Sequence, residues 1–293
     1  MNAHTAITSS QSGTVSPITG PIAGRTLEIG SGFQAQSFKY ADFGGAMDPL
    51  IMVDHFTMSE STFGPHGHAG ISAVSVLFED SVGAFNNRDS LDHDIDLMPG
   101  DLYWLKAGKG GMHDEKPRPG SRAHGLQMFV NLPAEQKYDD PIALHVKAGD
   151  MPIIEGSGYR VRVVLGESNG VQGARSPALP MTILDMQLSA AGRFSHSLLA
   201  QQAAWLHAVD GSATILIDGR EYPLPAGRAL ALRGDATWGE LTISSRDGAQ
   251  VALVQGQPLH EKFVQRGPFA MATEEEVTAV AAACERGEFG TIQ

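Results

Sequence analysis

Two pairs of potential metal ligands, each separated by one residue, constrain the fold of this sequence more than any other feature. His66 and His68 form the first pair, and His113 and Glu115 form the second. In an extended strand, residues i and i+2 point to the same face, so the two members of a pair can converge on one point. The spacing therefore favours a β-rich fold in which two neighbouring strands share one metal ion.

The donor set narrows the choice of metal but leaves its role open. Three imidazoles and one carboxylate suit a divalent transition metal such as iron, manganese, cobalt, nickel, copper or zinc. An octahedral ion would keep two positions for substrate or oxygen, whereas a tetrahedral zinc would be closed by the same four ligands and would be structural. The alternative readings are a pair of exposed loop histidines or a relic site that binds metal adventitiously.

Composition indicates a packed protein made of short strands. The 293 residues suffice for one large domain or two ordinary ones, and 42% are hydrophobic while 18% are charged. The 34 glycines and 16 prolines indicate many turns. A net charge of −12 argues against direct binding to nucleic acid, but not against a protein partner.

The single cysteine, Cys284, excludes an intramolecular disulfide and suits a reducing compartment. The first 24 residues lack the basic start and apolar run of a signal peptide, and no stretch reaches the roughly 20 apolar residues of a membrane helix. We therefore expect a cytoplasmic protein that binds no membrane.

Changes in composition divide the chain into four parts. We predict a flexible arm over 1–24, a metal-binding strand-rich half over 25–140, a second such half over 141–265, and a helix with a tail over 266–293. The polar, irregular stretch from 134 to about 158 is the expected link between the two halves.

A weak internal repeat relates the two halves. Leu97–Leu105 resembles Leu224–Leu232, since both combine a Pro/Gly turn with an apolar strand. Carrying the register across places 194–196 opposite the first ligand pair and 240–242 opposite the second. Neither ligand pair recurs there, so we predict that the second half has the fold of the first without its metal.

Local patterns predict a strand and a helix. Ile71–Phe78 reads as a strand, and without a bulge Val74 and Val76 would share a face with the histidines; Gly67 and Gly70 leave a bulge possible. Thr273 and Glu276 form a capping box. A helix over 274–286 follows, with Cys284 on its core-facing side.

Several other residues have two possible roles. Glu115 could be a ligand only, or could also accept a proton from a substrate hydroxyl. His55 and His124 could orient the ligands or be ordinary core or surface histidines, and His93 fits a solvated loop. Trp104 and Met112 could line a pocket or belong to the core.

Sequence motifs from about residue 25 onward resemble the pirin family. The matching stretches are Asp48–Phe56, Pro65–His68, Arg88–Ser90, Pro99–Trp104, Ala107–Glu115, Gly125–Pro133 and Gly267–Gly290. The resemblance implies an all-β bicupin, that is, two tandem cupin β-barrels with a short C-terminal α-helix. It also implies a mononuclear Fe2+ held in the first barrel by His66, His68, His113 and Glu115, and an empty second barrel.

Four positions depart from the pattern usual in that family. Ala69 stands where Arg is common, Ser72 where Glu is common, Asn87 where His is common, and Tyr103 where Gln is common. The ligands are intact, so these changes alter the pocket wall and the groups around the ligands, which tune metal and substrate.

The resemblance implies two alternative functions. The first is a dioxygenase, an oxidoreductase resembling quercetin 2,3-dioxygenase, in which Glu115 helps to remove the proton of a flavonol and O2 is the second substrate. The second is a non-catalytic, iron-dependent and redox-sensing regulator that binds a transcription factor or a metabolic enzyme.

Overall fold

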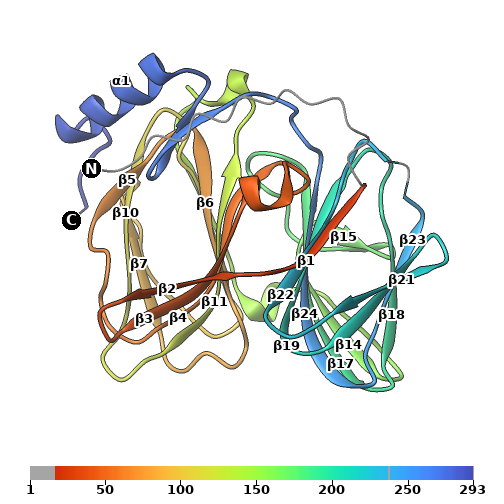
Figure 1. Ribbon diagram of the computed structural model, residues 1–293. Helices are drawn as coiled ribbons and strands as arrows, with labels where there is room; N and C mark the ends of the chain where they lie inside the picture. The colour runs from red at the N-terminus through yellow and green to blue at the C-terminus, as the bar shows by residue number, and fades with distance from the viewer. Residues whose placement is uncertain (1–16, 237, 293) are drawn as a thin grey trace.

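Two β-barrels lie side by side in the computed structural model, which describes residues 17–236 and 238–292 (Figure 1). Each barrel consists of one seven-stranded and one four-stranded antiparallel sheet. This architecture confirms the predicted all-β bicupin with a short C-terminal helix. Among the described residues, no helix has the length and apolarity needed to cross a bilayer.

The first barrel contains most of residues 25–146. Its larger sheet has the order β12 (Ile142–Val146), β9 (Leu102–Lys106), β6 (Ile71–Leu77), β11 (Ala123–Asn131), β4 (Leu50–Met58), β3 (Phe33–Lys39) and β2 (Arg25–Ile29). Its smaller sheet has the order β5 (His66–His68), β10 (Gly111–Pro117), β7 (Phe85–Asp89) and β8 (Asp94–Leu97). Two 3-10 helices accompany it, η1 (Tyr40–Phe43) and η2 (Ala134–Gln136).

The second barrel repeats this strand order. Its larger sheet has the order β1 (Ile18–Ala23), β22 (Arg228–Leu232), β19 (Ala203–Gly211), β24 (Asp247–Gly256), β17 (Met181–Ala190), β14 (Tyr159–Leu165) and β13 (Ile153–Gly156). Its smaller sheet has the order β18 (Arg193–Ser197), β23 (Glu240–Ser244), β20 (Ala213–Ile217) and β21 (Arg220–Leu224). The remaining elements are η3 (Ala148–Asp150) and the hairpin β15 (Glu167–Ser168) and β16 (Val171–Gln172). The β18–β23 pair therefore occupies the place that β5–β10 has in the first barrel, as the internal repeat predicted.

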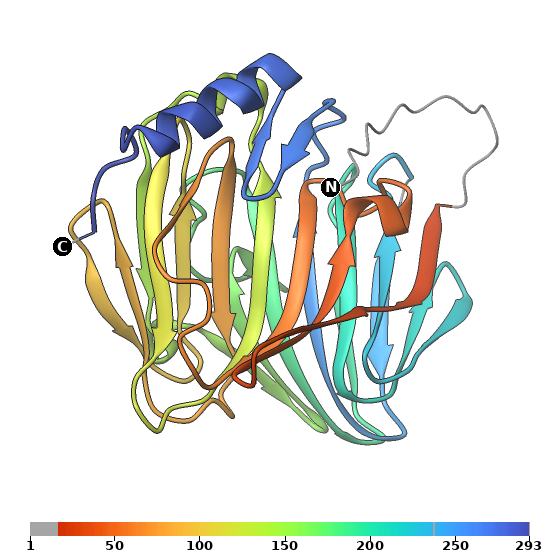
Figure 2. The same cartoon turned by 60° about the vertical axis from the view of Figure 1, so that its left-hand side comes forward.

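Each end of the described chain packs on the barrel that is formed mainly by the other half of the sequence. Strand β1 pairs with β22 and completes the larger sheet of the second barrel. The chain returns at its other end as β25 (Val264–Arg266), β26 (Phe269–Met271) and α1 (Glu274–Glu285), which lie over the first barrel (Figure 2). Each terminal segment thus stabilises the barrel that is more distant in sequence.

The structure changes two of the predicted boundaries, the end of the arm and the end of the first barrel. Residues 1–16 of the predicted arm lie outside the described residues, whereas Ile18 and Ile22 pack on buried apolar clusters and hold 18–23 in a strand. The predicted boundary after residue 140 assigns β12 to the second barrel. The strand in fact pairs with β9 of the first barrel, because Val146 is buried in the core between the barrels.

The largest apolar cluster lies between the two barrels and joins them. It contains Trp104 of the first barrel and Trp205 of the second, and neither side chain is exposed. A second cluster fills the interior of the C-terminal barrel, with Leu184, Leu206 and Ile215 among its members. The interior of the N-terminal barrel, by contrast, is only partly filled, which leaves space for a site.

The predicted strand parity after the histidines is wrong. Val74 and Val76 face the cluster between the barrels, and it is Ser75 that faces the interior of the first barrel. Gly70 has a φ of +72°, and there the chain passes from β5 in the smaller sheet to β6 in the larger one. The no-bulge parity therefore fails because the chain turns at Gly70 and enters a different sheet.

Helix α1 begins at the predicted capping box. The Thr273 hydroxyl accepts a hydrogen bond from the Glu276 amide, and the Glu276 carboxylate accepts one from the Thr273 amide. Val277 is buried against the first barrel together with the partly buried Cys284. This helix covers the strand that carries the first two histidines.

Candidate metal centre

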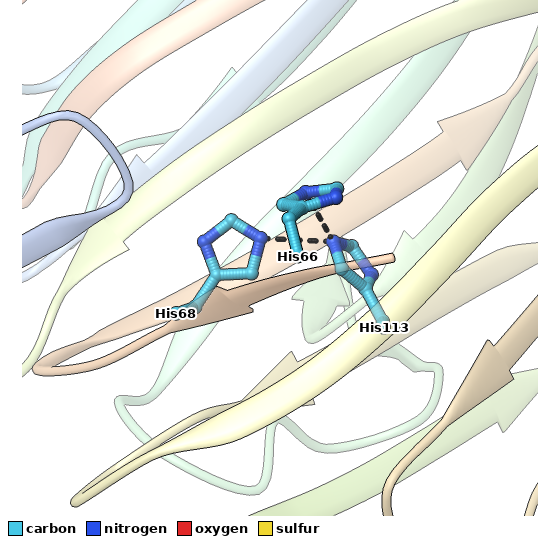
Figure 3. A group of neighbouring side chains, drawn as sticks. All are labelled: His66, His68 and His113. Carbon is cyan, nitrogen blue, oxygen red and sulfur yellow. Dashed lines mark hydrogen bonds between the residues drawn. The ribbon is translucent and has the colours of Figure 1, made fainter. Parts of the chain in front are cut away.

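His66, His68 and His113 bring three ring nitrogens to one point (Figure 3). The Nε2 atom of His113 lies 2.8 Å from Nε2 of His68 and 3.0 Å from Nε2 of His66. The first two residues come from β5 and the third from β10, and His66 is directly opposite His113 in this antiparallel pair. The alternation of side chains along two short strands thus produces the cluster.

The hydrogen bonds at the Nδ1 atoms of His66 and His68 indicate that the Nε2 atoms suit a cation. Nδ1 of His66 donates to the carbonyl of Gly64 at 2.8 Å, and Nδ1 of His68 points at the carbonyl of Pro268 at 3.4 Å. A neutral imidazole that donates from Nδ1 has only a lone pair on Nε2. Two lone pairs therefore face His113, which has at most one Nε2 hydrogen to share between them. A metal ion satisfies all three nitrogens at once.

Burial keeps the imidazoles of His68 and His113 neutral. His68 and His113 are each 1% exposed. Burial, reinforced by the neighbouring histidines, lowers the pKa of His68 to about 3 and that of His113 well below its usual value. Neutral imidazole is the form that binds a metal, so the donor set is ready at neutral pH.

Glu115 lies beside the three histidines with its carboxylate held by two donors. Its Oε1 atom accepts hydrogen bonds from Ser75 Oγ at 2.5 Å and from Asn87 Nδ2 at 2.8 Å. Its Oε2 atom is 4.0 Å from Nδ1 of His113. Burial raises the pKa of Glu115 to about 7, against the lowering effect of both hydrogen bonds. The role of Glu115 as a ligand stays a prediction.

The cluster opens onto a cavity of about 390 Å³ inside the first barrel. Most of its wall is apolar, and the large side chains that form it are Phe33, Met52, Phe56, Met58, Phe85 and Phe129. Phe63 and Leu27 are exposed and line the same cavity. A volume in this range with a few polar groups is typical of a small-molecule site.

The C-terminal segment also contributes to the cavity. Gly267 and Pro268, in the turn between β25 and β26, form part of its wall. Lys137 attaches this segment to the first barrel, because its buried ammonium donates to the carbonyl of Gly70 and to the carbonyl of Ala270 at 2.8 and 2.9 Å. The sequence did not predict this contribution, because the segment is more than a hundred residues away from the histidines along the chain. The stretch Gly267–Gly290 was nevertheless one of those that resemble the pirin family.

The remaining candidate residues lie elsewhere. Nε2 of His55 is 2.8 Å from Nε2 of His124, and both residues face the second barrel, not the metal ligands. His93 pairs with Asp89 at 2.8 Å and is partly exposed. Trp104 belongs to the core between the barrels, and Met112 packs in the apolar cluster under α1.

Family models for "Pirin" and for "Pirin C-terminal cupin domain" match residues 29–130 and 183–290. Mouse Pirin is 31% identical over 234 residues, which cover 79% of each chain. The chain belongs to the pirin family. A Pseudomonas aeruginosa relative, provisionally named a quercetin 2,3-dioxygenase, is 31% identical over 242 residues, covering 78% of this chain and 82% of the relative. The solved structure of quercetin 2,3-dioxygenase from Acinetobacter baumannii has a TM-score of 0.80 at 23% identity and covers 92% of this chain and 96% of its own, a likeness that shows the fold.

The departures from the usual pirin pattern have different consequences in the structure. Asn87 holds Glu115, and the hydroxyl of Tyr103 donates to Asp89, so both still act on groups near the cluster. Ala69 is fully buried under the C-terminal segment. The Ser72 hydroxyl is buried without a hydrogen-bond partner among the described residues. Two of the four departures thus lie among the groups around the cluster, and the other two lie outside it.

Proposed function

We propose that this pirin-family protein is a mononuclear Fe2+ dioxygenase that acts on quercetin-type flavonols. The observation that carries the proposal is the convergence of three imidazoles at the wall of a largely apolar cavity. The names of the Pseudomonas aeruginosa and Acinetobacter baumannii proteins supply the substrate class.

His66, His68 and His113 would hold the ion, and Glu115 is the candidate fourth ligand. The bound iron supplies a site where a flavonol oxygen and O2 come together and electrons are exchanged. The chain fixes the ligand tautomers through the carbonyls of Gly64 and Pro268. These hydrogen bonds keep the imidazoles oriented without any contribution from substrate.

Glu115 would accept the proton of the flavonol hydroxyl. Ser75 and Asn87 both donate to Oε1, so Oε2 is the oxygen left to take a proton. A base whose pKa is near 7 can exchange a proton at neutral pH with little cost in either direction. The same carboxylate could serve as a ligand when no substrate is bound.

The apolar wall would orient the substrate and exclude water. Phe129 contacts the ring of His68 with centroids 5.1 Å apart, and Phe56 stacks on Phe33 at 6.0 Å. Flat aromatic rings gain both apolar burial and ring contacts against such surfaces. A dry cavity also strengthens the electrostatic effect of the polar groups within it.

The test combines metal analysis with flavonol consumption. Protein loaded with ferrous iron should contain about one ion per chain and should deplete quercetin in air, followed by the loss of flavonol absorbance. His66→Ala should lose both bound iron and activity, because two imidazoles remain at the site. His260→Ala, at an exposed histidine, is the matched control and should retain both. Quercetin loss that is equal in wild type and His66→Ala rejects the proposal.

A further inference from the structure

A row of polar side chains crosses the inner face of the larger sheet in the first barrel. Its members are directly opposed across four antiparallel strand pairs, and they are Tyr103, Ser75, Gln127, Asp54 and Ser37. Opposed residues point to the same face of a sheet. Gln127 and Asp54 line the cavity, which establishes that this face is the interior one.

The rows on both sides of this one carry apolar residues at the positions next to Gln127 and Asp54. Phe129 and Met52 are opposed to each other on one side, and Phe56 stands opposite Gly125 on the other. Hydrogen bonding to this sheet inside the cavity is therefore confined to a single line across the strands. A ligand lying on the sheet meets polar atoms only along that line.

One end of the row is connected to the metal centre. The Ser75 hydroxyl lies 2.5 Å from Glu115 and 2.7 Å from the side-chain amide of Gln127. Its single hydrogen is shared between two oxygen acceptors, Oε1 of Glu115 and Oε1 of Gln127, so Ser75 links the row to Glu115.

Asp54 is the unexplained member of the row. The residue is only 7% exposed, and it lines the cavity. Ser37 hydrogen-bonds to the carboxyl group, yet Oδ1 has no hydrogen-bond partner among the described residues. A buried carboxylate oxygen without a donor destabilises a fold. Its presence in the cavity is consistent with a donor supplied by a ligand.

The spacing of the strands gives the length of that ligand. Ser75 and Asp54 stand on β6 and β4, with only β11 between them. Two strand spacings amount to roughly 10 Å. Because Ser75 holds Glu115 at one end of the row, a ligand that reaches from Glu115 to Asp54 spans roughly this distance, with a hydrogen bond of roughly 2.7 Å at each end.

We propose that Asp54 is a specificity-determining residue that accepts a hydrogen bond from a hydroxyl on the pendant ring of a flavonol. The proposal rests on the proposed function, because the other end of the substrate is placed at the three histidines and Glu115. Substrates of this class therefore carry two hydroxyl groups at opposite ends, and the apolar rows hold the rings between them.

The experiment measures binding without turnover. Iron-loaded protein is titrated calorimetrically, with oxygen excluded, using quercetin and using galangin, whose pendant ring has no hydroxyl. Wild type should bind quercetin about tenfold more tightly, the value of one hydrogen bond to a carboxylate. Asp54→Asn should reduce the preference to about threefold, because a neutral acceptor forms the weaker bond. Asp54→Leu should abolish it.

Asp48→Asn is the matched control. Asp48 is also buried, at 8% exposure, but lies outside this cavity, so the variant should keep the tenfold preference. Circular dichroism checks that each variant is folded, and the isosteric Asp54→Asn remains informative even when Asp54→Leu does not fold. A preference that is unchanged in Asp54→Asn overturns the proposal.

The outcomes separate this proposal from the proposed function. An Asp54-dependent preference in a protein that consumes no flavonol in air upholds the subsite and rejects the dioxygenase. Flavonol consumption with equal quercetin-to-galangin ratios of kcat/KM in wild type and Asp54→Asn upholds the dioxygenase and rejects the subsite. A wild type that binds neither flavonol rejects both.

Discussion

Three histidines form a hydrogen-bonded chain between the barrels, and we predict that it destabilises the protein as the pH falls. His207 donates from Nδ1 to the carbonyl of Arg228, so its Nε2 must accept, and it lies 2.9 Å from Nδ1 of His55. By the same reasoning Nε2 of His55 accepts from His124, 2.8 Å away. The opposite nitrogen of His124 lies 2.7 Å from the carboxylate of Asp80. A proton added to Nε2 of His55 or of His207 would point at the N–H group of the neighbouring histidine, so protonation breaks that hydrogen bond.

The magnitude follows from two pKa values. Burial, with neighbouring histidines adding to it, lowers the pKa of His207 from 6.5 to about 3 and that of His55 to about 4. In the unfolded chain both histidines take up a proton as the pH falls through 6.5, whereas in the folded protein they stay neutral. Unfolding is therefore favoured between pH 7 and 5, by about 2 kcal/mol for each histidine.

His207→Gln tests this reasoning. Glutamine can keep an acceptor near the position of Nε2, but it has no titratable group in this pH range. Between pH 7 and 5, the free energy of unfolding should fall by about 2 kcal/mol less in the variant than in wild type. Urea titration of metal-free protein measures this, and Trp205, which stacks on His207 with centroids 5.5 Å apart, is a local fluorescence reporter.

The three clustered histidines are present in both proteins, so their contribution cancels in the comparison. His260→Gln, at an exposed histidine, controls for the loss of a histidine as such and should follow wild type. An identical pH dependence for wild type and His207→Gln would refute the assigned proton positions.

Two further predictions concern the C-terminal segment. Lys137→Met removes an ammonium that donates to Gly70, Asn131 and Ala270, and we expect a loss of about 2 kcal/mol in free energy of unfolding together with faster proteolysis of the segment. Gly70→Ala would place a Cβ 1.9 Å from the carbonyl oxygen of Ala270 and should weaken iron binding, measured by competition with a chelator. Gly44→Ala, also at positive φ but with nothing within 4 Å, controls for backbone strain and should cost only about 1 kcal/mol in stability without weakening iron binding.

Local geometry explains why the convergence of the histidines could be predicted from sequence. His66 and His68 needed only the alternation of an extended strand to converge, and the match to β5 required no knowledge of the rest of the fold. The helix was predictable for a similar reason, because Thr273 and Glu276 are three residues apart and act on each other. Such signals depend on a few neighbouring residues.

Long-range pairing explains what the sequence did not predict. The placement of Asp54 opposite Gln127 depends on the register between β4 and β11, which no local pattern specifies. The crossing of β1 into the second barrel likewise depends on its pairing with β22, about two hundred residues later in the chain. Composition predicted that the first 24 residues form a flexible arm, because nothing in their own sequence indicates the pairing with β22.

The second barrel shows that this fold does not by itself make a metal centre. His196 lies on β18, the counterpart of β5, but Ser168 occupies its Nδ1 at 2.9 Å and Gln255 its Nε2 at 2.7 Å. Both nitrogens of that imidazole therefore have protein partners, and an apolar cluster fills the barrel around it. In the first barrel the Nε2 lone pairs of His66 and His68 have at most one hydrogen to share, that of His113 Nε2, and they border an open cavity. The two halves thus share one strand order but differ in unsatisfied lone pairs and unfilled space, which is the physical reason to place the proposed chemistry in the first barrel.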